Sequence, residues 1–194
     1  MNAPVTFDPA DAKPATMVLT YSVRLQPTRE QRLSLARILE QQRQLYNAAL
    51  DERIECFRKT GKTLNDIAQS KSLTQIRADD PDFAGVQRRI QRATLIRLQR
   101  AFQAFFRRAK AGAGAQSGFP KFAGREHWHG FGFDAPLQIQ FDGRRLRFAG
   151  MKGGLRVSKR DARRLQPMTA ETWKGVHFKR AGSGWGAAWR VTFQ

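Results

Sequence analysis

Hydrophobic positions change their spacing twice along the chain. Residues 17 to 25, MVLTYSVRL, alternate between apolar and polar side chains, which predicts a β-strand. From residue 28 to residue 110 the apolar residues recur every three or four positions, the period of an α-helix. After residue 118 short alternating runs return, separated by glycine-rich turns. This order predicts an α+β fold, a small antiparallel β-barrel with a helical bundle inserted after its first strand.

The helical part of the chain is expected to contain three main helices. Thr28 and Gln31 have the spacing of a capping box and predict the start of the first helix. Gly61 is the expected C-terminal cap of that helix. A shorter helix is expected over residues 64 to 77, and a third over residues 86 to 110.

The C-terminal part is expected to contain two hairpins and a short strand. Asp142 and Gly143 in QIQFDGRRLRFA form the strongest short hairpin signal of the sequence. LRV at 155 to 157 is a candidate strand, and residues 173 to 193 form a second hairpin around a glycine-rich loop. The tryptophans of these strands are interpreted as core residues: Trp173, Trp185 and Trp189.

These elements divide the chain into five predicted parts. The N-terminal segment, rich in Pro, Ala and Asp, has neither the basic start nor the apolar run of a signal peptide. The expected parts are a disordered leader (1–16), the first barrel strand (17–27), a helical recognition lobe (28–110), a linker (111–118) and the β-barrel (119–194).

The charge balance indicates a polyanionic partner. The chain has 35 Lys and Arg against 16 Asp and Glu, a formal charge of +19. In a compact fold so many positive charges repel one another. This favours nucleic acid as the partner over the alternatives, a generic solubility surface or a membrane-surface protein. No run approaches the roughly 18 apolar residues of a membrane span. The single cysteine, Cys56, excludes an internal disulfide and indicates a reducing, intracellular compartment.

The helix predicted over residues 86 to 110 is the most informative element. It contains eight basic residues and no acid, and no acid occurs anywhere from Phe83 to Arg125. Solvated faces normally mix charges of both signs, so a face of one sign predicts contact with nucleic acid. Arg97 and Arg108 fall near its apolar edge, and the other basic residues cluster opposite that edge: Arg88, Arg89, Arg92, Arg100, Arg107 and Lys110.

A second basic segment, residues 151 to 165, carries six bases and one acid. Its glycines allow close backbone approach, and arginine binds two phosphate oxygens at once. The segment is therefore a second candidate nucleic-acid contact, through Lys152, Arg156, Lys159, Arg160, Arg163 and Arg164.

The histidines raise the question of a metal site. His127 and His129 lie two residues apart, which on a strand places both imidazoles on one face. A zinc site needs three or four ligands, no cysteine is near, and His177 lies far along the chain. All three histidines are therefore interpreted as ordinary strand or loop residues, and no metal ligand is assigned.

The acidic residues do not indicate catalysis. Two-metal nucleases need several convergent carboxylates, whereas the acids after residue 111 are dispersed along the chain. No phosphate-binding loop, dinucleotide fingerprint or nucleophile elbow is present. The sequence predicts a binding protein with no catalytic residue and no cofactor of its own. The acids after residue 111 are Glu126, Asp134, Asp142, Asp161 and Glu171.

Four motifs, in this order and spacing, carry a family resemblance: RLQPTREQ, LYNAALDER, LIRLQRAFQAFFRR and GFPKF. The chain resembles, over about residues 17 to 194, the N-terminal half of TnpB (OrfB), an insertion-sequence-encoded RNA-guided nuclease family related to type V CRISPR effectors. The residues that match the pattern are Tyr46, Asn47, Phe102, Phe105, Phe106, Gly118, Phe119, Pro120 and Phe122.

The resemblance implies a wedge-type β-barrel with a recognition lobe inserted after its first strand. In the family this half binds the scaffold of a guide RNA and helps to read a short motif beside the DNA target. Cleavage belongs to a following RuvC-like domain with three carboxylates and a zinc finger, so a divalent metal and zinc would belong to that region. The sequence ends at WRVTFQ, about where this domain would begin. The expected location is the prokaryotic cytoplasm, in association with the nucleoid.

The resemblance also suggests residue roles. The regions around Ser70 and Arg88 to Arg92 are expected near the target-adjacent DNA, and Lys121 and Arg125 are expected to face phosphate. Within GFPKF, Gly118 and Pro120 are expected to set the backbone, and Phe119 and Phe122 to anchor the segment in the core.

Three other interpretations stay open. The chain is half of a split nuclease that a separately encoded RuvC-like chain completes, or a standalone DNA-binding regulator derived from the same lobe. A basic RNA-binding protein of ribosomal type is the third.

Overall fold

A computed structural model describes residues 20–112, 118–133, 139–165, 175–182 and 188–193. The predicted leader, residues 17–19 of the first strand, most of the linker, Trp173 and Trp185 lie outside the described residues.

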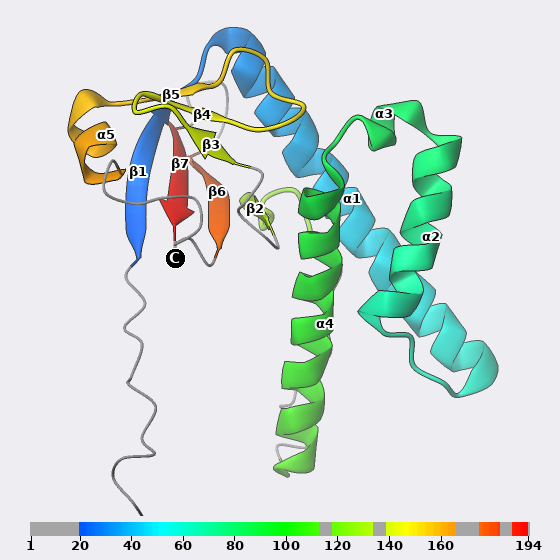
Figure 1. The fold of residues 1–194 in the computed structure, drawn as a ribbon. Helices are drawn as coiled ribbons and strands as arrows, with labels where there is room; N and C mark the ends of the chain where they lie inside the picture. Colours follow the sequence, from blue (N-terminus) through cyan, green and yellow to red (C-terminus); the bar gives the residue numbers. More distant parts are fainter. Residues whose placement is uncertain (1–19, 113–117, 134–138, 166–174, 183–187, 194) are drawn as a thin grey trace, which may run out of the picture.

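The described residues form a helical part and one antiparallel sheet, which confirms the α+β class (Figure 1). The helices are α1 (Arg29–Thr60), α2 (Asp66–Asp79), α3 (Pro81–Ala84), α4 (Arg88–Lys110) and α5 (Lys159–Leu165). The strands are β1 (Tyr21–Gln26), β2 (Gly130–Phe133), β3 (Gln140–Phe141), β4 (Arg145–Arg147), β5 (Leu155–Val157), β6 (Val176–Ala181) and β7 (Ala188–Phe193).

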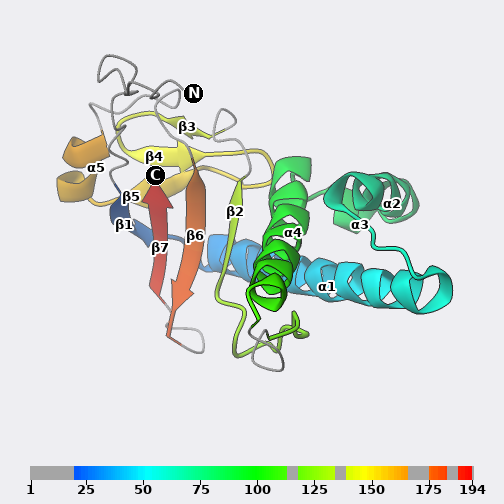
Figure 2. The same ribbon diagram turned by 90° about the horizontal axis from the view of Figure 1, so that it is seen from below.

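The described strands form one open antiparallel sheet of seven strands, consistent with the predicted wedge-like β domain beside the helical part. Its strand order is β2-β6-β7-β1-β5-β4-β3, and β2 and β3 do not pair within the described part of the chain. The edge strand β2 packs beside α4 instead (Figure 2). The sheet nevertheless encloses a core, since the Phe148 ring, just after β4, lies 5.4 Å from Phe133 on β2 and 5.3 Å from Phe178 on β6.

Strand β1 occupies the centre of this sheet, between β7 and β5. Val23 and Leu25 are buried, whereas their sequence neighbours point outward, as the alternating pattern predicts. The chain therefore leaves the sheet after a central strand, forms α1 to α4, and re-enters at the edge strand β2. This route confirms the predicted helical insertion after the first strand.

Both predicted hairpins are present. The carboxylate of Asp142 accepts hydrogen bonds from the backbone N–H groups of Arg144 (3.0 Å) and Arg145 (2.7 Å). Gly143 adopts φ 85°, the left-handed conformation that this tight turn needs. Strands β6 and β7 form the second hairpin, and Trp189 on β7 is a core residue, as predicted.

Helix α1 begins and ends at the predicted caps. Thr28 Oγ1 accepts from the Gln31 backbone N–H at 3.3 Å, and Gln31 Oε1 accepts from the Thr28 N–H at 3.1 Å. At the other end the Gly61 N–H donates to the Phe57 carbonyl at 2.8 Å. Gln31 Nε2 also donates to the Lys152 carbonyl at 2.8 Å, which joins the start of α1 to the turn before β5.

The side chain of Asn47 holds the segment that leads back to the sheet. Its Oδ1 accepts from the Ala123 N–H at 2.7 Å, and its Nδ2 donates to the Ala123 carbonyl at 3.1 Å. Arg43 Nη1 donates to the same carbonyl at 3.0 Å. The neighbouring ring of Tyr46 packs against Trp128, with 5.1 Å between ring centroids. The Tyr46–Asn47 motif therefore holds the returning chain on α1.

Within the GFPKF segment Pro120 is buried, and the Gly118 carbonyl accepts from Arg108 Nη2 at 3.2 Å. Phe119 is 47% exposed, but its ring makes edge contacts with Phe102 (5.5 Å) and Phe105 (5.3 Å) on α4. The prediction that Phe122 anchors the segment is wrong, because its side chain is 56% exposed. The hydrogen bonds of Ala123 fix the chain at this point, so no buried ring is needed there.

We expect Asn47→Ala to lower the free energy of unfolding by about 1–3 kcal/mol, because it leaves a part-buried backbone donor without its partner. Urea denaturation measures the change. Gln44→Ala, an exposed position on the same helix, is the matched control and should shift stability by less than about 0.5 kcal/mol. Equal effects of the two substitutions would contradict the role of Asn47.

We expect Phe122→Ala to change stability by less than about 0.5 kcal/mol, as at other exposed positions. Phe178→Ala is the matched comparison, because the Phe178 side chain is 0% exposed and its loss should cost about 3–5 kcal/mol. Thermal and urea unfolding of both variants test this contrast. A large loss from Phe122→Ala would show that its ring packs in the core in solution.

Candidate nucleic-acid interface

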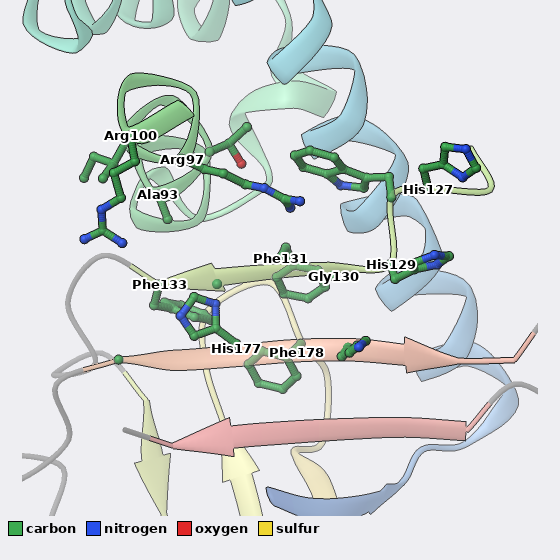
Figure 3. A pocket seen from close by; sticks show the side chains of 16 residues that line it. Ala93, Arg97, Arg100, His127, His129, Gly130, Phe131, Phe133, His177 and Phe178 are labelled. Carbon is green, nitrogen blue, oxygen red and sulfur yellow. The ribbon is translucent and has the colours of Figure 1, made fainter. Parts of the chain in front are cut away.

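A pocket of about 620 Å³ lies between α4 and the β2–β6 side of the sheet (Figure 3). Its lining contains arginine, lysine and histidine side chains and, among the described residues, no Asp or Glu. A concave, acid-free, basic surface is the electrostatic footprint expected for a bound polyanion.

Helix α4 supplies the cationic wall of this pocket through Arg97 and Arg100. Arg89, Arg100 and Arg107 are spaced by 11 and 7 residues, about three and two helical turns, so they share one face of α4. Part of the basic face predicted from the sequence therefore faces the sheet across the pocket.

Arg97 is a pocket residue that the sequence did not assign. Its guanidinium lies 4.0 Å from the centroid of the Trp128 ring, a cation–π contact. Trp128 is buried, and its other ring neighbour is Tyr46. The sequence did place Arg97 at the edge of the apolar face of the helix. An arginine at such an edge can pack against the neighbouring element and still reach solvent, so this position could have marked it as a pocket residue.

Strand β6 supplies His177, which the register places opposite Gly132 on β2. A Cβ atom on residue 132 would lie 2.5 Å from His177 Nδ1, so the glycine makes room for the imidazole. His177 is exposed to the pocket, yet burial by the surrounding protein lowers its pKa, and the charges of Arg100 and Arg97 lower it further. The lowered pKa favours the neutral imidazole, whereas a bound anion would favour its protonation.

The other two histidines line the same pocket. Figure 3 shows His127 and His129 at one end and His177 toward the other. The sequence interpretation treated them as ordinary strand or loop residues and did not predict that all three line one pocket. Within the described ranges, no three His, Cys, Asp or Glu side chains are grouped to hold a metal ion.

Strands β2 and β6 form the floor of the pocket, and the other face of these strands carries packed aromatic rings. Because Gly132 and His177 pair on the pocket side, strand alternation places Phe131, Phe133 and Phe178 on the core side. Phe131 and Phe178 stack with 5.2 Å between centroids and an interplanar angle of 14°, and Phe133 lies 6.1 Å from Phe178. All three rings are buried, so the strands beneath the pocket are held rigidly.

Ser70, Arg88 and Arg92, assigned from the resemblance, belong to the side where α2 packs on α4. The Arg88 guanidinium donates to Thr74 Oγ1 at 2.9 Å. The Ser70 hydroxyl, one turn before Thr74, donates to the Asp66 carbonyl at 2.8 Å. The structure thus places Ser70 and Arg88 on neighbouring parts of one helical surface, separate from the pocket.

The second predicted basic segment starts near the helices, where Gln31 of α1 binds the Lys152 carbonyl, and ends in α5, on the side of the sheet away from α4 (Figures 1 and 2). Three strands, β6, β7 and β1, separate β2 from β5. The structure therefore forms two basic surfaces rather than one. The exposed basic residues of this second surface are Lys152, Arg156, Lys159, Arg160, Arg163 and Arg164.

Lys121 and Arg125 are both exposed and flank the Asn47-bound turn. Arg125 forms an ion pair with Glu40 on α1, at 3.5 Å. That contact ties Arg125 to the helical part, next to the pocket segment that carries His127.

Among the described helices there is no segment with both the length and the apolar character that a membrane span requires.

Comparison with known proteins gives a family match over part of the chain. No curated protein matches the chain. A helix-turn-helix domain family of OrfB and IS605 proteins matches residues 17–62, fewer than half of the chain. In the structure the described part of this segment forms β1 and the single helix α1, and the next helix, α2, begins beyond it. The match supports an OrfB/IS605, TnpB-type N-terminal region, and its helix-turn-helix family suggests DNA binding.

Proposed function

We propose that this chain is the nucleic-acid-binding part of a TnpB-like RNA-guided system, which binds a guide-RNA scaffold and target-adjacent DNA without catalysis of its own. One observation carries the proposal. Cationic and histidine side chains from α4, β6 and the segment before β2 line one pocket, and no described acid lines it.

Two separate basic surfaces fit two nucleic-acid ligands. In this proposal the α2–α4 surface with Ser70 and Arg88, and the neighbouring pocket, face target-adjacent DNA. The surface at β5 and α5 holds the RNA scaffold. Because three strands lie between β2 and β5, two polyanions can bind at the same time without bringing their phosphates together.

Strand cleavage, in this proposal, comes from a RuvC-like nuclease region or a separate RuvC-like chain, to which a divalent metal and zinc would belong. Two acids of this chain already have structural partners. Asp142 closes its hairpin turn, and Asp161 Oδ2 accepts from the Arg24 backbone N–H at 3.3 Å.

A second candidate is a standalone DNA-binding regulator, favoured by the family match over β1 and α1, which suggests DNA binding alone. Sequencing the RNA that co-purifies with the expressed chain separates the two. A discrete structured RNA supports the guide-RNA proposal. Only heterogeneous cellular RNA, together with occupancy of one short DNA motif across the genome, supports the regulator.

We expect Arg100→Gln/Arg107→Gln to weaken binding to duplex DNA and to flatten its salt dependence. Each lost phosphate contact should reduce the slope of log K against log salt by about 0.9. Fluorescence anisotropy titrations between about 50 and 200 mM salt give the slope.

The control for this variant is Arg37→Gln/Arg147→Gln, which removes the same charge from α1 and β4. Both side chains already pair with a carboxylate, Arg37 with Asp82 at 2.8 Å and Arg147 with Asp142 at 2.9 Å. The control should leave the slope nearly unchanged. Equal slopes for both variants would show that only net charge matters, not the face of α4.

We expect duplex DNA to raise the pKa of His177, because a nearby phosphate favours the imidazolium. In the free protein this pKa is lowered, by burial first and then by Arg100 and Arg97. The complex therefore takes up a proton on forming, so affinity increases as pH falls through the interval between the free and bound pKa values. Lys179 on β6, and His127 and His129 before β2, are the other cationic or titrating groups of the pocket.

Titration of the histidine ring protons by NMR, with and without a DNA duplex, measures this shift. His177→Asn assigns the resonance and should remove the part of the pH dependence of affinity that His177 contributes. An unchanged His177 pKa in the complex would place the phosphates elsewhere.

A further inference from the structure

A second pocket, of about 380 Å³, lies between the C-terminal halves of α1 and α4. It opens on a different face of α4 from the basic pocket, since Gln99, Phe102 and Phe106 line it in place of Arg97 and Arg100. Five of its lining residues are phenylalanines, and three of these are well exposed: Phe57 (57%), Phe106 (43%) and Phe119 (47%). A group of exposed aromatic rings around a hollow marks a place where a ligand binds.

Arg53 gives this pocket an unusual polar group. Its side chain lines the pocket, yet the residue is only 5% exposed. Nε donates to Gln69 Oε1 at 2.7 Å, Nη1 donates to Gln99 Oε1 at 2.8 Å, and the guanidinium lies 4.9 Å from the centre of the Phe102 ring. Nη2 is buried and has no hydrogen-bond partner. A buried cationic donor without an acceptor is costly, and a ligand that supplies an acceptor oxygen removes that cost.

The remaining polar groups of the pocket are amides and a hydroxyl, from Gln99, Gln103, Asn65 and Thr63. Arginine, glutamine and asparagine are the side chains that hydrogen-bond to the edges of nucleobases. Phenylalanine rings stack on the faces of unpaired bases. The pocket therefore combines groups for the face of a base with groups for its edge.

The ends of α1 and α4 next to this pocket are basic. Arg58, Lys59 and Lys62 follow the pocket residue Phe57, and Arg107 and Lys110 follow Phe106; all are exposed. A ligand that carries phosphates beside an apolar, flat group matches both the rim and the interior. A protein segment with one carboxylate would match Arg53 but would leave the amides and the row of rings without a specific role.

We propose that this pocket binds one unpaired nucleobase of a bound nucleic acid, with the face of the base against the phenylalanines and a carbonyl oxygen accepting from Arg53 Nη2. The assignment rests on the proposed nucleic-acid binding and adds to it a preference for particular bases. Guanine, uracil, thymine and cytosine carry a carbonyl oxygen, whereas adenine does not, so the pocket favours the first four.

The test uses labelled single-stranded oligonucleotides that differ at one central position: guanine, 2-aminopurine, adenine or an abasic site. Guanine should bind more tightly than the abasic site by about 5- to 150-fold, the range measured for stacking on aromatic side chains. 2-Aminopurine lacks the O6 oxygen and the N1–H of guanine, so a preference for guanine over 2-aminopurine reports hydrogen bonds to this edge of the base, including the one from Arg53, without altering the protein.

Phe57→Ala/Phe106→Ala, at two exposed positions, should remove the preference for guanine over the abasic site and leave abasic binding unchanged. Phe122→Ala is the matched control, an exposed phenylalanine that does not line the pocket, and it should keep the preference. Equal binding of guanine and abasic strands, or a preference that survives Phe57→Ala/Phe106→Ala, would overturn the base pocket but not the proposed function. Failure of the wild-type chain to bind any of these strands or a duplex would overturn both.

Discussion

The two hydrogen bonds between Asn47 and the backbone of Ala123 determine where the chain returns from the helices to the sheet. Trp128, five residues later, then meets Tyr46, and β2 begins two residues after Trp128. Because β2 starts from this fixed point, it runs beside α4, and the space between them becomes the basic pocket. Segments that lie far apart in the sequence, Tyr46–Asn47 and the stretch from Ala123 to Trp128 just after GFPKF, thus hold one another in place.

The packing of Trp128 and β2 also explains how the fold accommodates the positive charge of the pocket. The cationic wall of the pocket is held by packing instead of by carboxylates: Arg97 lies over Trp128, and His177 occupies the space left by Gly132. Carboxylate partners would position these groups equally well, but their negative charge would cancel the positive potential that attracts a polyanion. The helical part, in contrast, keeps ion pairs such as Arg43–Glu40, where the charge does not face the pocket.

Local signals predicted most of the fold. The capping box at Thr28, the Asp142–Gly143 turn and the alternation of β1 each depend on a few neighbouring residues, and each is present. The open edge of the sheet, the placement of three histidines along one pocket and the exposure of Phe122 depend on contacts between distant segments, which no local pattern encodes. For two pocket arginines the sequence did contain a usable signal, because Arg97 and Arg53 occupy positions where the helical period predicts apolar residues.

Arg97 and Arg53 line two different pockets, which lie on different faces of α4. Each lies against an aromatic ring, but Arg97 reaches the open basic pocket, whereas Arg53 is enclosed by α1, α2 and α4 and keeps one donor unpartnered. An open guanidinium binds a solvated anion at low desolvation cost, which suits phosphate. An enclosed one binds only a group that can leave water and enter an aromatic pocket, which suits a nucleobase. Because the helical period places the two pockets on different faces of α4, the same helix can contact the backbone and the bases of one nucleic acid with different chemistry.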